Sequence, residues 1–471
     1  MDQFVNRSEE LDRLQALYES ATAELAIIYG RRQIGKSELV RQSIADRDDA
    51  VYYQAVQGTA TTQLRRFVEA AATTYPDITA VKEEWEPLLT HLVDRDAIIV
   101  IDEFPYLIES NEGLPSIIQH LWDTAVDESQ ATLVLTGSAI GMIHTHVLDG
   151  GAPLYGRVSQ TPNGRLELTQ LPFRSIKAFV PTYDPEKRVF VYGVFGGTPR
   201  YLSPLDPSRS LGENITRLLY DPDGPLHDEP ETVLQMELNE VNTYFSVLES
   251  MASGNRSRNE IAQGAGIAST NTSYYFDRLG TLQIIEKHHP ALADPARSKR
   301  TRYQIRDPVF RFYFRYLYGR GGQYELYGEN AYADLIEPEL PDFVSETFES
   351  LCHQAVPALY TDYQLTQVPS QWWYKGREVD IIAPTDGSTL IAGEAKFTNT
   401  PLGYDVLADL EDDVEHIDWT PTGGGEPTYD FALFSRSGFK SSVEEVADER
   451  DDLRLFDLSD IVAVLESGAN Q

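Results

Sequence analysis

Short apolar runs in the first part of the chain predict buried strands. Five such runs alternate with helical sequence, near residues 25–29, 51–55, 97–101, 132–136 and 166–171. An apolar run without polar alternation is typical of a strand covered on both faces, and strands that alternate with helices form parallel sheets. We therefore predict an α/β domain with a parallel sheet over residues 1–171.

Beyond residue 171, the predicted secondary structure differs between three successive segments. Residues 172–239 are helical and interrupted by proline, which predicts a small helical lid. Residues 240–325 predict helical segments near 244–251, 257–267 and 271–279, followed by a strand at 284–287. Residues 326–471 combine helix with apolar strands again, which predicts a second α/β domain.

The sequence GRRQIGKS, at residues 30–37, lies between the first predicted strand and a helix and fits the pattern G-x-x-x-x-G-K-[ST]. Gly30 and Gly35 permit a tight turn in which backbone N–H groups face an anion. Lys36 would reach the β- and γ-phosphates of ATP, and the Ser37 hydroxyl would bind Mg²⁺. The sequence thus predicts a site for ATP and Mg²⁺, against the alternative of an ordinary glycine turn.

Polar residues follow two further predicted strands at the same edge of the expected sheet. Asp102 and Glu103 end the run AIIVIDE, and Ser138 follows the run TLVLTG. Ligands of open α/β sheets bind where the strands end. We expect Asp102 to hold Mg²⁺, Glu103 to polarise the attacking water as the catalytic base, and Ser138 to sense the γ-phosphate. The alternative is a pair of solvated acids at a strand end.

Composition and charge narrow the class of protein. The 471 residues include 74 acidic and 39 basic ones, which gives a formal charge of −35, yet 41% of positions are hydrophobic. This balance predicts folded domains with a solvated acidic shell, and the composition is similar to that of proteins from halophilic archaea. The single cysteine, Cys352, excludes an intrachain disulfide and is predicted to be a buried, inert thiol.

The hydropathy of the chain bears on its location. No apolar run approaches the roughly 18 residues of a membrane-spanning helix, and the first residues do not have the pattern of a signal peptide. We therefore expect a cytoplasmic protein with no membrane partner. Oligomerisation stays open.

The motifs of the predicted ATP site together resemble the archaeal branch of the AAA and STAND ATPases. The opening FVNRSEEL, at residues 4–11, is similar to that family's F-x-G-R-x-x-E-L box, with Asn6 in place of the usual glycine. LYGR at 154–157 and GGTPRYL at 196–202 are similar to its G-R element and its lid motif. The resemblance implies that Pro199 lies near the adenine and that Arg157 senses or neutralises phosphate; the simpler alternative for Arg157 is a solvated surface group.

The elements predicted for residues 240–325 resemble a winged helix, in which the third helix would enter a major groove. A basic segment begins in the predicted strand and continues beyond it, and it contains Lys287, Arg297, Lys299, Arg300, Arg302 and Arg306. In so acidic a chain this cluster predicts phosphate contacts with DNA. The alternative is that the winged helix serves only as a spacer between domains.

Two carboxylates and a lysine near the C-terminus predict a second chemical site. The sequence GREVDIIA is followed by TLIAGEAKF, and in a strand Glu394 and Lys396 share one face. If the two segments pair as neighbouring strands, Asp380 and Glu394 converge with Lys396 beside them. Two carboxylates bind a hard divalent cation, and the lysine can orient water or stabilise charge during phosphodiester cleavage, so we predict all three as catalytic residues.

The spacing D-x(13)-E-x-K resembles the PD-(D/E)XK nuclease superfamily, over about residues 341–465. The resemblance implies a restriction-endonuclease-like α/β fold and a metal site formed by Glu349, Asp380 and Glu394, with Glu349 on the first helix. Val379 stands where the motif has its proline. The alternative is a domain that retains the fold and only binds.

The sequence as a whole predicts four parts: a P-loop ATPase domain at 1–171, a helical lid at 172–239, a winged helix at 240–325 and a nuclease-like domain at 326–471. We expect the nucleotide state to control the last domain, acting on nucleic acid. The alternative is a nucleotide-switched DNA-binding or signalling protein whose last domain is catalytically silent.

Overall fold

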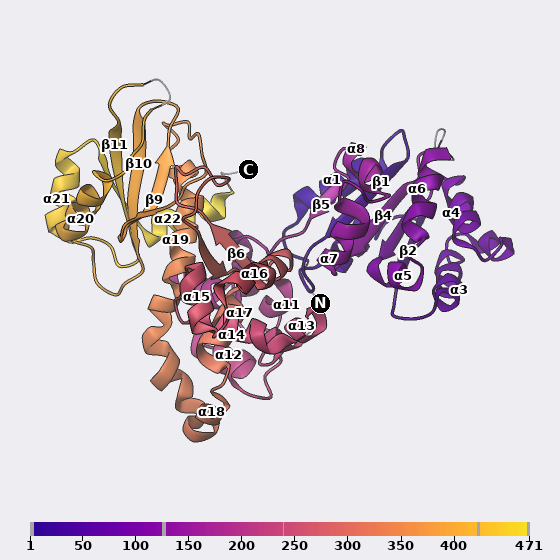
Figure 1. Cartoon of the computed structure of the whole chain (residues 1–471), viewed down its shortest axis with the longest axis horizontal. Helices are drawn as coiled ribbons and strands as arrows, with labels where there is room; N and C mark the ends of the chain where they lie inside the picture. The colour runs from indigo at the N-terminus through magenta and orange to yellow at the C-terminus, as the bar shows by residue number, and fades with distance from the viewer. Residues whose placement is uncertain (1–3, 125–128, 239, 422–423, 469–471) are drawn as a thin grey trace. The chain divides into compact units, whose positions relative to one another are not determined.

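The computed structural model describes residues 4–124, 129–238, 240–421 and 424–468. The chain forms two compact units, which Figure 1 shows in indigo to magenta and in magenta to yellow. The N-terminal unit is Met1–Leu171 with Thr198–Arg200, and the C-terminal unit is Pro172–Gly197 with Tyr201–Gln471.

The N-terminal unit is built on a five-stranded sheet in the order β2-β3-β4-β1-β5, in which every pair is parallel. Side chains of β1, β3 and β4 are buried along their whole length, and odd and even positions enter separate cores on the two faces. The predicted parallel sheet is confirmed. Its strands are β1 (Glu24–Tyr29), β2 (Ala50–Gln54), β3 (Ile98–Asp102), β4 (Thr132–Gly137) and β5 (Arg165–Glu167).

Helices lie between the strands of this unit and cover the sheet. They are α1 (Ser8–Tyr18), α2 (Lys36–Ser43), α3 (Ala60–Ala71), α4 (Trp85–Val93), α5 (Pro105–Ser110), α6 (Leu114–Thr124), α7 (Ile140–Ile143) and α8 (Tyr155–Gln160).

The fifth strand is shorter than the sequence predicts. The apolar run at 166–171 indicated a strand to its end, but β5 stops at Glu167. The Leu168 N–H still bonds to the Tyr29 carbonyl, whereas the Thr169 carbonyl accepts its hydrogen bond from the guanidinium of Arg7. The Arg7 side chain thus takes the place of a strand partner. The pattern of apolar residues cannot show such a hydrogen bond, so it could not predict where β5 ends.

The C-terminal unit contains a five-stranded mixed sheet in the order β12-β11-β10-β9-β8. β8, β9 and β10 pair antiparallel, and β10, β11 and β12 pair parallel. Figure 1 shows α20 and α21 on one face of this sheet and α19 and α22 on the other. Its strands are β8 (Ser370–Tyr374), β9 (Arg377–Pro384), β10 (Thr389–Lys396), β11 (Thr428–Ser435) and β12 (Leu453–Asp457).

The segment before this sheet contains the three predicted helices and the predicted strand, followed by a second strand that the sequence analysis did not predict. α14 (Val241–Ala252), α15 (Arg258–Gly264) and α16 (Thr272–Thr281) precede an antiparallel pair, β6 (Ile285–His288) and β7 (Arg302–Ile305). A capping box begins α15, since Ser257 accepts from the Glu260 N–H while Glu260 accepts from the Ser257 N–H. The assignment of this segment as a winged helix stays a prediction.

The C-terminal unit contains further helices beside those already described. They are α9 (Ile176–Phe179), α10 (Pro185–Phe195), α12 (Leu211–Ile215), α13 (Glu229–Glu237), α17 (Pro308–Phe312), α18 (Gly321–Tyr327), α19 (Leu340–Leu359), α20 (Tyr404–Val414), α21 (Ser441–Glu449) and α22 (Leu458–Ser467); α11 (Pro199–Leu202) begins in the N-terminal unit. No described helix is long and apolar enough to cross a membrane.

One hydrophobic core runs through the C-terminal unit. It joins α10, α14, α17 and α19 to the inner face of the mixed sheet. At the contact of α10 with α19, a methyl group on Gly193 would lie 2.7 Å from Val344, so the two helices approach as closely as glycine permits. The core therefore does not stop at the predicted boundaries 239/240 and 325/326; Asn239 itself lies outside the described residues.

Candidate functional site

At two positions, the loop between β1 and α2 has a backbone conformation that only glycine adopts easily. Gly30 has φ +148 and Gly35 has φ +94. A side chain on Gly30 would also lie 2.3 Å from the Leu168 carbonyl oxygen. Gly35 immediately precedes α2, so the loop delivers backbone N–H groups and the helix N-terminus to one place, an arrangement suited to an anion.

Lys36 and Ser37 are the first two residues of α2. The Lys36 side chain is buried, and its ammonium donates to the carbonyl oxygens of Gly30 at 2.9 Å and Arg31 at 2.7 Å. Ser37 is half-buried beside it. The lysine that the motif predicts is therefore held over the loop that would surround the phosphates.

Arg7 is a loop residue that sequence reasoning left without a role. Its buried guanidinium donates to the carbonyls of Ile34, in the loop, and Thr169, after β5, and it forms an ion pair with Glu10 at 2.8 Å. Asn6, at the usual glycine position of the FVNRSEEL box, has φ +54, a conformation that asparagine tolerates better than most residues. The signal for Arg7 was present in that box, but its contacts are not visible in a linear motif.

Asp102 ends β3 and is completely buried. Its carboxylate accepts hydrogen bonds from the Tyr52 hydroxyl at 2.6 Å and from the Thr136 hydroxyl. Burial and the neighbouring Asp102 both raise the pKa of Tyr52, so this phenol stays a donor. Two hydroxyls thus fix the orientation of the carboxylate at the end of β3.

Glu103 and Ser138 meet beside Asp102. The Ser138 hydroxyl donates to the Glu103 carboxylate oxygens at 2.8 and 3.0 Å, and the Ser138 N–H donates at 3.3 Å. Glu103 has φ +57, and its own N–H donates to the Thr136 hydroxyl. The structure therefore brings together the predicted base and the predicted phosphate sensor.

The structure places Pro199 and Arg157, the two residues implied by the family resemblance, in different surroundings. Pro199 lies on the phosphate loop, because a methyl group on Gly35 would be 3.9 Å from its ring. Arg157, on α8, forms an ion pair with Asp123 in the last turn of α6. The structure brings Pro199 to the loop and joins Arg157 to α6 instead.

The second predicted site lies where β9 and β10 run side by side. The two strands pair antiparallel, with Ile381 opposite Gly393. The Asp380 carboxylate accepts from the Ala395 N–H at 3.1 Å and lies 3.5 Å from the Lys396 ammonium, which also pairs with Glu394. The predicted convergence of Asp380, Glu394 and Lys396 is present.

Crowding of carboxylates changes the protonation of this site. Burial and the nearby Asp380 raise the pKa of Glu394 to about 7, while Lys396 opposes the rise. Burial and Asp380 also raise the pKa of Glu349, on α19, well above its usual range. Burial alone would lower the pKa of Lys396, but the carboxylates of Asp380 and Glu394 outweigh it and raise that pKa.

Glu349 does not complete a three-carboxylate ligand set. Within the described part of the chain, no group of three or more His, Cys, Asp or Glu side chains is placed to share a metal ion. Asp380 and Glu394 fit a divalent cation as a pair, since Mg²⁺ is often bound by one or two carboxylates and several waters. The acid predicted from the first helix lies close enough to Asp380 for the charge of that carboxylate to raise its pKa.

Two arginines from the segments before the mixed sheet reach the same acidic region, one from the loop between α14 and α15 and one from α17, and the sequence did not predict them. Arg256 and Arg311 both pair with Glu346, one turn before Glu349 on α19. His353, one turn after Glu349, donates through Nε2 to the Asp380 carbonyl at 2.7 Å. Cys352 is fully buried there, as predicted. These contacts depend on tertiary packing between distant segments, which no local pattern encodes.

Comparisons with known proteins agree with the N-terminal site. A family described as an ATPase domain predominantly from Archaea matches residues 4–205, and a family of archaeal and bacterial proteins of unknown function matches residues 313–409. An uncharacterized protein of Methanocaldococcus jannaschii is 31% identical over 390 residues, which cover 81% of this chain and 84% of that protein. The chain belongs to this archaeal ATPase family.

Two further similarities bear on the archaeal ATPase. An uncharacterized ATP-binding protein of the same organism is 41% identical over 44 residues, covering 9% of this chain and 75% of that protein. The Walker-type ATPase of Pyrococcus abyssi has a similar fold, with a TM-score of 0.51 and 18% identity, covering 66% of this chain and 96% of that structure. Family membership implies nucleotide binding at the phosphate loop, with Mg²⁺ as the usual companion of ATP.

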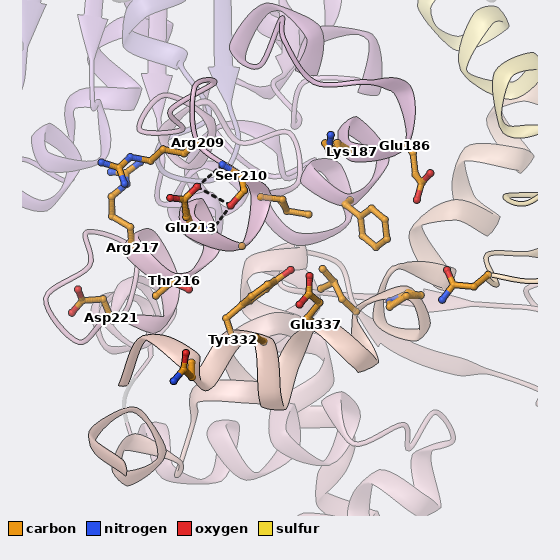
Figure 2. Close-up of a pocket in the computed structure, with 18 of the residues that line it drawn as sticks. Glu186, Lys187, Arg209, Ser210, Glu213, Thr216, Arg217, Asp221, Tyr332 and Glu337 are labelled. Carbon is orange, nitrogen blue, oxygen red and sulfur yellow. Dashed lines mark hydrogen bonds between the residues drawn. The ribbon is translucent and has the colours of Figure 1, made fainter. Parts of the chain in front are cut away.

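A cavity of about 910 Å³ lies elsewhere in the C-terminal unit of this archaeal ATPase (Figure 2). Glu186 and Lys187 of α10 lie on one side and Tyr332 and Glu337 on another, and the Ser210–Glu213 capping box forms part of the wall. Charges of both signs line it, and it does not include Asp380, Glu394 or Lys396. Arg436, which also lines it, pairs with Glu186 and packs over Phe190 and Phe397.

Proposed function

We propose that this archaeal ATPase, of the AAA/STAND class, couples ATP hydrolysis in its N-terminal unit to a nuclease-like, metal-dependent site in its C-terminal unit that acts on nucleic acid. The observation that carries the second half of the proposal is the convergence of Asp380, Glu394 and Lys396 on paired strands. The proposal requires two sites with separate chemistry, and each is argued from its own residues.

At the ATP site, the loop and Lys36 would hold the β- and γ-phosphates while Pro199 borders the nucleotide. Ser37 and Asp102 would hold Mg²⁺, which offsets phosphate charge when it is bound. Glu103 would take the proton of the attacking water, and Ser138 would orient Glu103 and contact the γ-phosphate. Arg157, which the family resemblance implies as a phosphate sensor, forms an ion pair with Asp123 and would have to exchange that partner to contact phosphate.

At the second site, Asp380 and Glu394 offer the hard oxygen ligands that divalent cations prefer. A divalent cation there would supply a lowered pKa for bound water and charge stabilisation on the phosphate. Lys396 is positioned by both carboxylates to orient the water or to balance negative charge on the phosphate oxygens. The raised pKa of Glu394 means that cation binding would displace a proton near neutral pH.

A second candidate function has a specific observation in its favour. The Lys396 ammonium already pairs with both carboxylates, and the described residues offer no third His, Cys, Asp or Glu ligand. Such a site can be electrostatically satisfied without a metal. The chain would then be a nucleotide-switched DNA-binding or signalling protein, with the basic segment after β6 as its contact with DNA.

The deciding experiment uses the full chain. Cleavage of linear and plasmid DNA and of RNA is measured with Mg²⁺ or Mn²⁺ in molar KCl, because the acidic shell resembles that of halophilic proteins. Asp380→Asn should lose both cleavage and metal-dependent thermal stabilisation, whereas Lys396→Ala should lose cleavage and keep the stabilisation. Asp386→Asn, an exposed acid in the turn after β9, is the matched control.

ATP turnover separates the two halves of the proposal. It should be unchanged in the Asp380 and Lys396 variants when no nucleic acid is present, since these residues belong to the other unit. Absence of any metal-dependent stabilisation and of any cleavage by the wild-type chain would remove the nuclease and leave the binding function.

A further inference from the structure

The segment between β6 and β7 is fixed along the outer edge of the mixed sheet. The Ala291 N–H donates to the Gln371 carbonyl of β8 at 2.8 Å, and the Ala291 side chain packs in one core with Trp372 and Val379. β8 is the last strand of the sheet, so this contact covers its edge. The basic segment predicted from the sequence is therefore attached to the sheet that carries Asp380.

Aromatic rings of β8 hold the cations that follow this contact. The Arg302 guanidinium lies 4.5 Å from the Trp373 ring and pairs with Glu378 at 2.7 Å. The Arg300 guanidinium lies 5.0 Å from the Tyr374 ring and donates to the Trp373 carbonyl at 3.3 Å. Arg302 is thus used as an anchor, while Arg300 is exposed and held in place by a ring.

The turn between β8 and β9 adds another cation at the same place. Lys375 and Gly376 have φ +50 and +83, which turn the chain tightly, and the Lys375 ammonium lies 4.9 Å from the same Tyr374 ring. Arg297, whose side chain is 89% exposed, and the exposed Lys299 precede Arg300. We call Arg297, Lys299, Arg300 and Lys375 the basic ridge.

Lys375 of the basic ridge lies in the turn directly before β9, the strand that carries Asp380. Asp380 is four residues beyond Gly376, and at about 3.3 Å per residue this places it roughly 13 Å along the strand. Phosphates of one DNA strand repeat about every 3.4 Å along the duplex axis. The separation thus corresponds to about four nucleotides of a duplex strand.

We propose that the basic ridge binds the phosphodiester backbone of a nucleic acid and presents it to the Asp380–Glu394 pair. The ridge consists of cations on a chain whose formal charge is −35, and Asp294 is the acid that pairs with it among the described residues. Cations alone read no bases, so the binding is independent of sequence. The role of the carboxylates rests on the proposed function, while binding by the ridge stands without it.

The test is nucleic-acid binding by the full chain in EDTA, so that cleavage plays no part. Probes are a labelled duplex DNA and single-stranded DNA and RNA of the same sequence, titrated from 0.2 to 1 M KCl. Changing all four ridge residues to Ser should lower affinity at least about tenfold at the lowest salt and reduce the salt slope by about three to four. The preferred nucleic acid is read from the wild-type affinities.

Two controls separate an organised ridge from bulk charge. Changing Arg65, Lys82, Lys177 and Lys187 to Ser removes four exposed cations from elsewhere and should leave binding unchanged. Tyr374→Ala removes the ring under Arg300 and Lys375 without changing the net charge and should weaken binding several-fold, whereas Tyr404→Ala, at an equally exposed tyrosine, should not. If the variant with all four ridge residues changed does not fold, Lys375→Ser alone is measured in its place.

The outcomes are distinct. The proposal is overturned if the ridge and control variants lose equal amounts of nucleic-acid affinity. It is also overturned if the wild type binds none of the probes. If binding depends on the ridge and the control variants bind as the wild type does, the proposal stands even where no cleavage is found.

Discussion

The hydroxyl of Ser138 donates to both carboxylate oxygens of Glu103, at 2.8 and 3.0 Å. The two residues directly follow neighbouring strands, β3 and β4, whose register brings Ile101 opposite Leu135. A carboxylate held in this way has a fixed direction. In the proposed mechanism, Ser138 would therefore position the base as well as contact the γ-phosphate.

Glu103→Gln should preserve ATP affinity and lower hydrolysis by about a hundredfold or more, because the amide keeps the shape and cannot accept the proton. Nucleotide binding is measured by isothermal titration and turnover by phosphate release. Ser138→Ala should give a smaller loss of turnover with binding retained. Parallel losses of binding and turnover in Glu103→Gln would speak against its role as the base.

Lys36→Ala should weaken ATP binding by about tenfold to a hundredfold, since charge-assisted hydrogen bonds to phosphate are lost. Its buried ammonium lies over the phosphate loop, and no other lysine of that loop can replace it. Lys82→Ala, at an exposed lysine paired with Glu84, is the control and should bind as the wild type does. Unchanged affinity in Lys36→Ala would contradict the assignment of the loop.

Gly193→Ala should destabilise the C-terminal unit by about 1–3 kcal/mol, because the added methyl group would lie 2.7 Å from Val344 in a packed core. Gly280→Ala, on α16, has open space around it and should stabilise the chain by about 0.5–1 kcal/mol. Denaturant unfolding of both variants measures the difference. Equal stability of the two variants would mean that α10 and α19 are less closely packed than described.

The pH dependence of stability should report on Glu394. Its folded pKa is raised, by burial first and Asp380 second, from 4.5 to about 7. The folded chain therefore holds this proton more tightly, and the resulting stabilisation is present below about pH 4.5 and lost as the pH rises through about 7. In EDTA, the melting temperature of the wild type should fall across this window relative to Glu394→Gln.

The control for this pH dependence is Glu415→Gln, at an exposed acid after α20, whose profile should follow the wild type. The prediction fails if Glu394→Gln also parallels the wild type.

The elements that hold the nucleotide were predictable because they are local. Continuous apolar runs predicted β1 to β4, and the glycine spacing predicted the loop. The end of β5 and the contacts of Arg7 were not predictable, because the Thr169 carbonyl accepts its hydrogen bond from a side chain more than 160 residues away in sequence. Local patterns report which residues are apolar, and they do not report which distant donor satisfies a backbone group.

The second site was also predictable only in its local part. Asp380, Glu394 and Lys396 could be found from the alternation of two adjacent strands. The placement of Glu349 could not, because it depends on how α19 lies over the sheet and on Arg256 and Arg311 holding Glu346 beside it. The metal set inferred from resemblance therefore included a third acid that the described geometry does not bring into a shared ligand group.

The continuous core of the C-terminal unit determines how this chain can be dissected. A fragment beginning at residue 326 would expose the faces of Val344 and Phe348 that α10 and its neighbours cover. Such a fragment would aggregate, and its inactivity would be uninformative. In a calorimeter, α9 to α13, the helices before the sheet and the sheet itself should share one cooperative transition, because one core joins them.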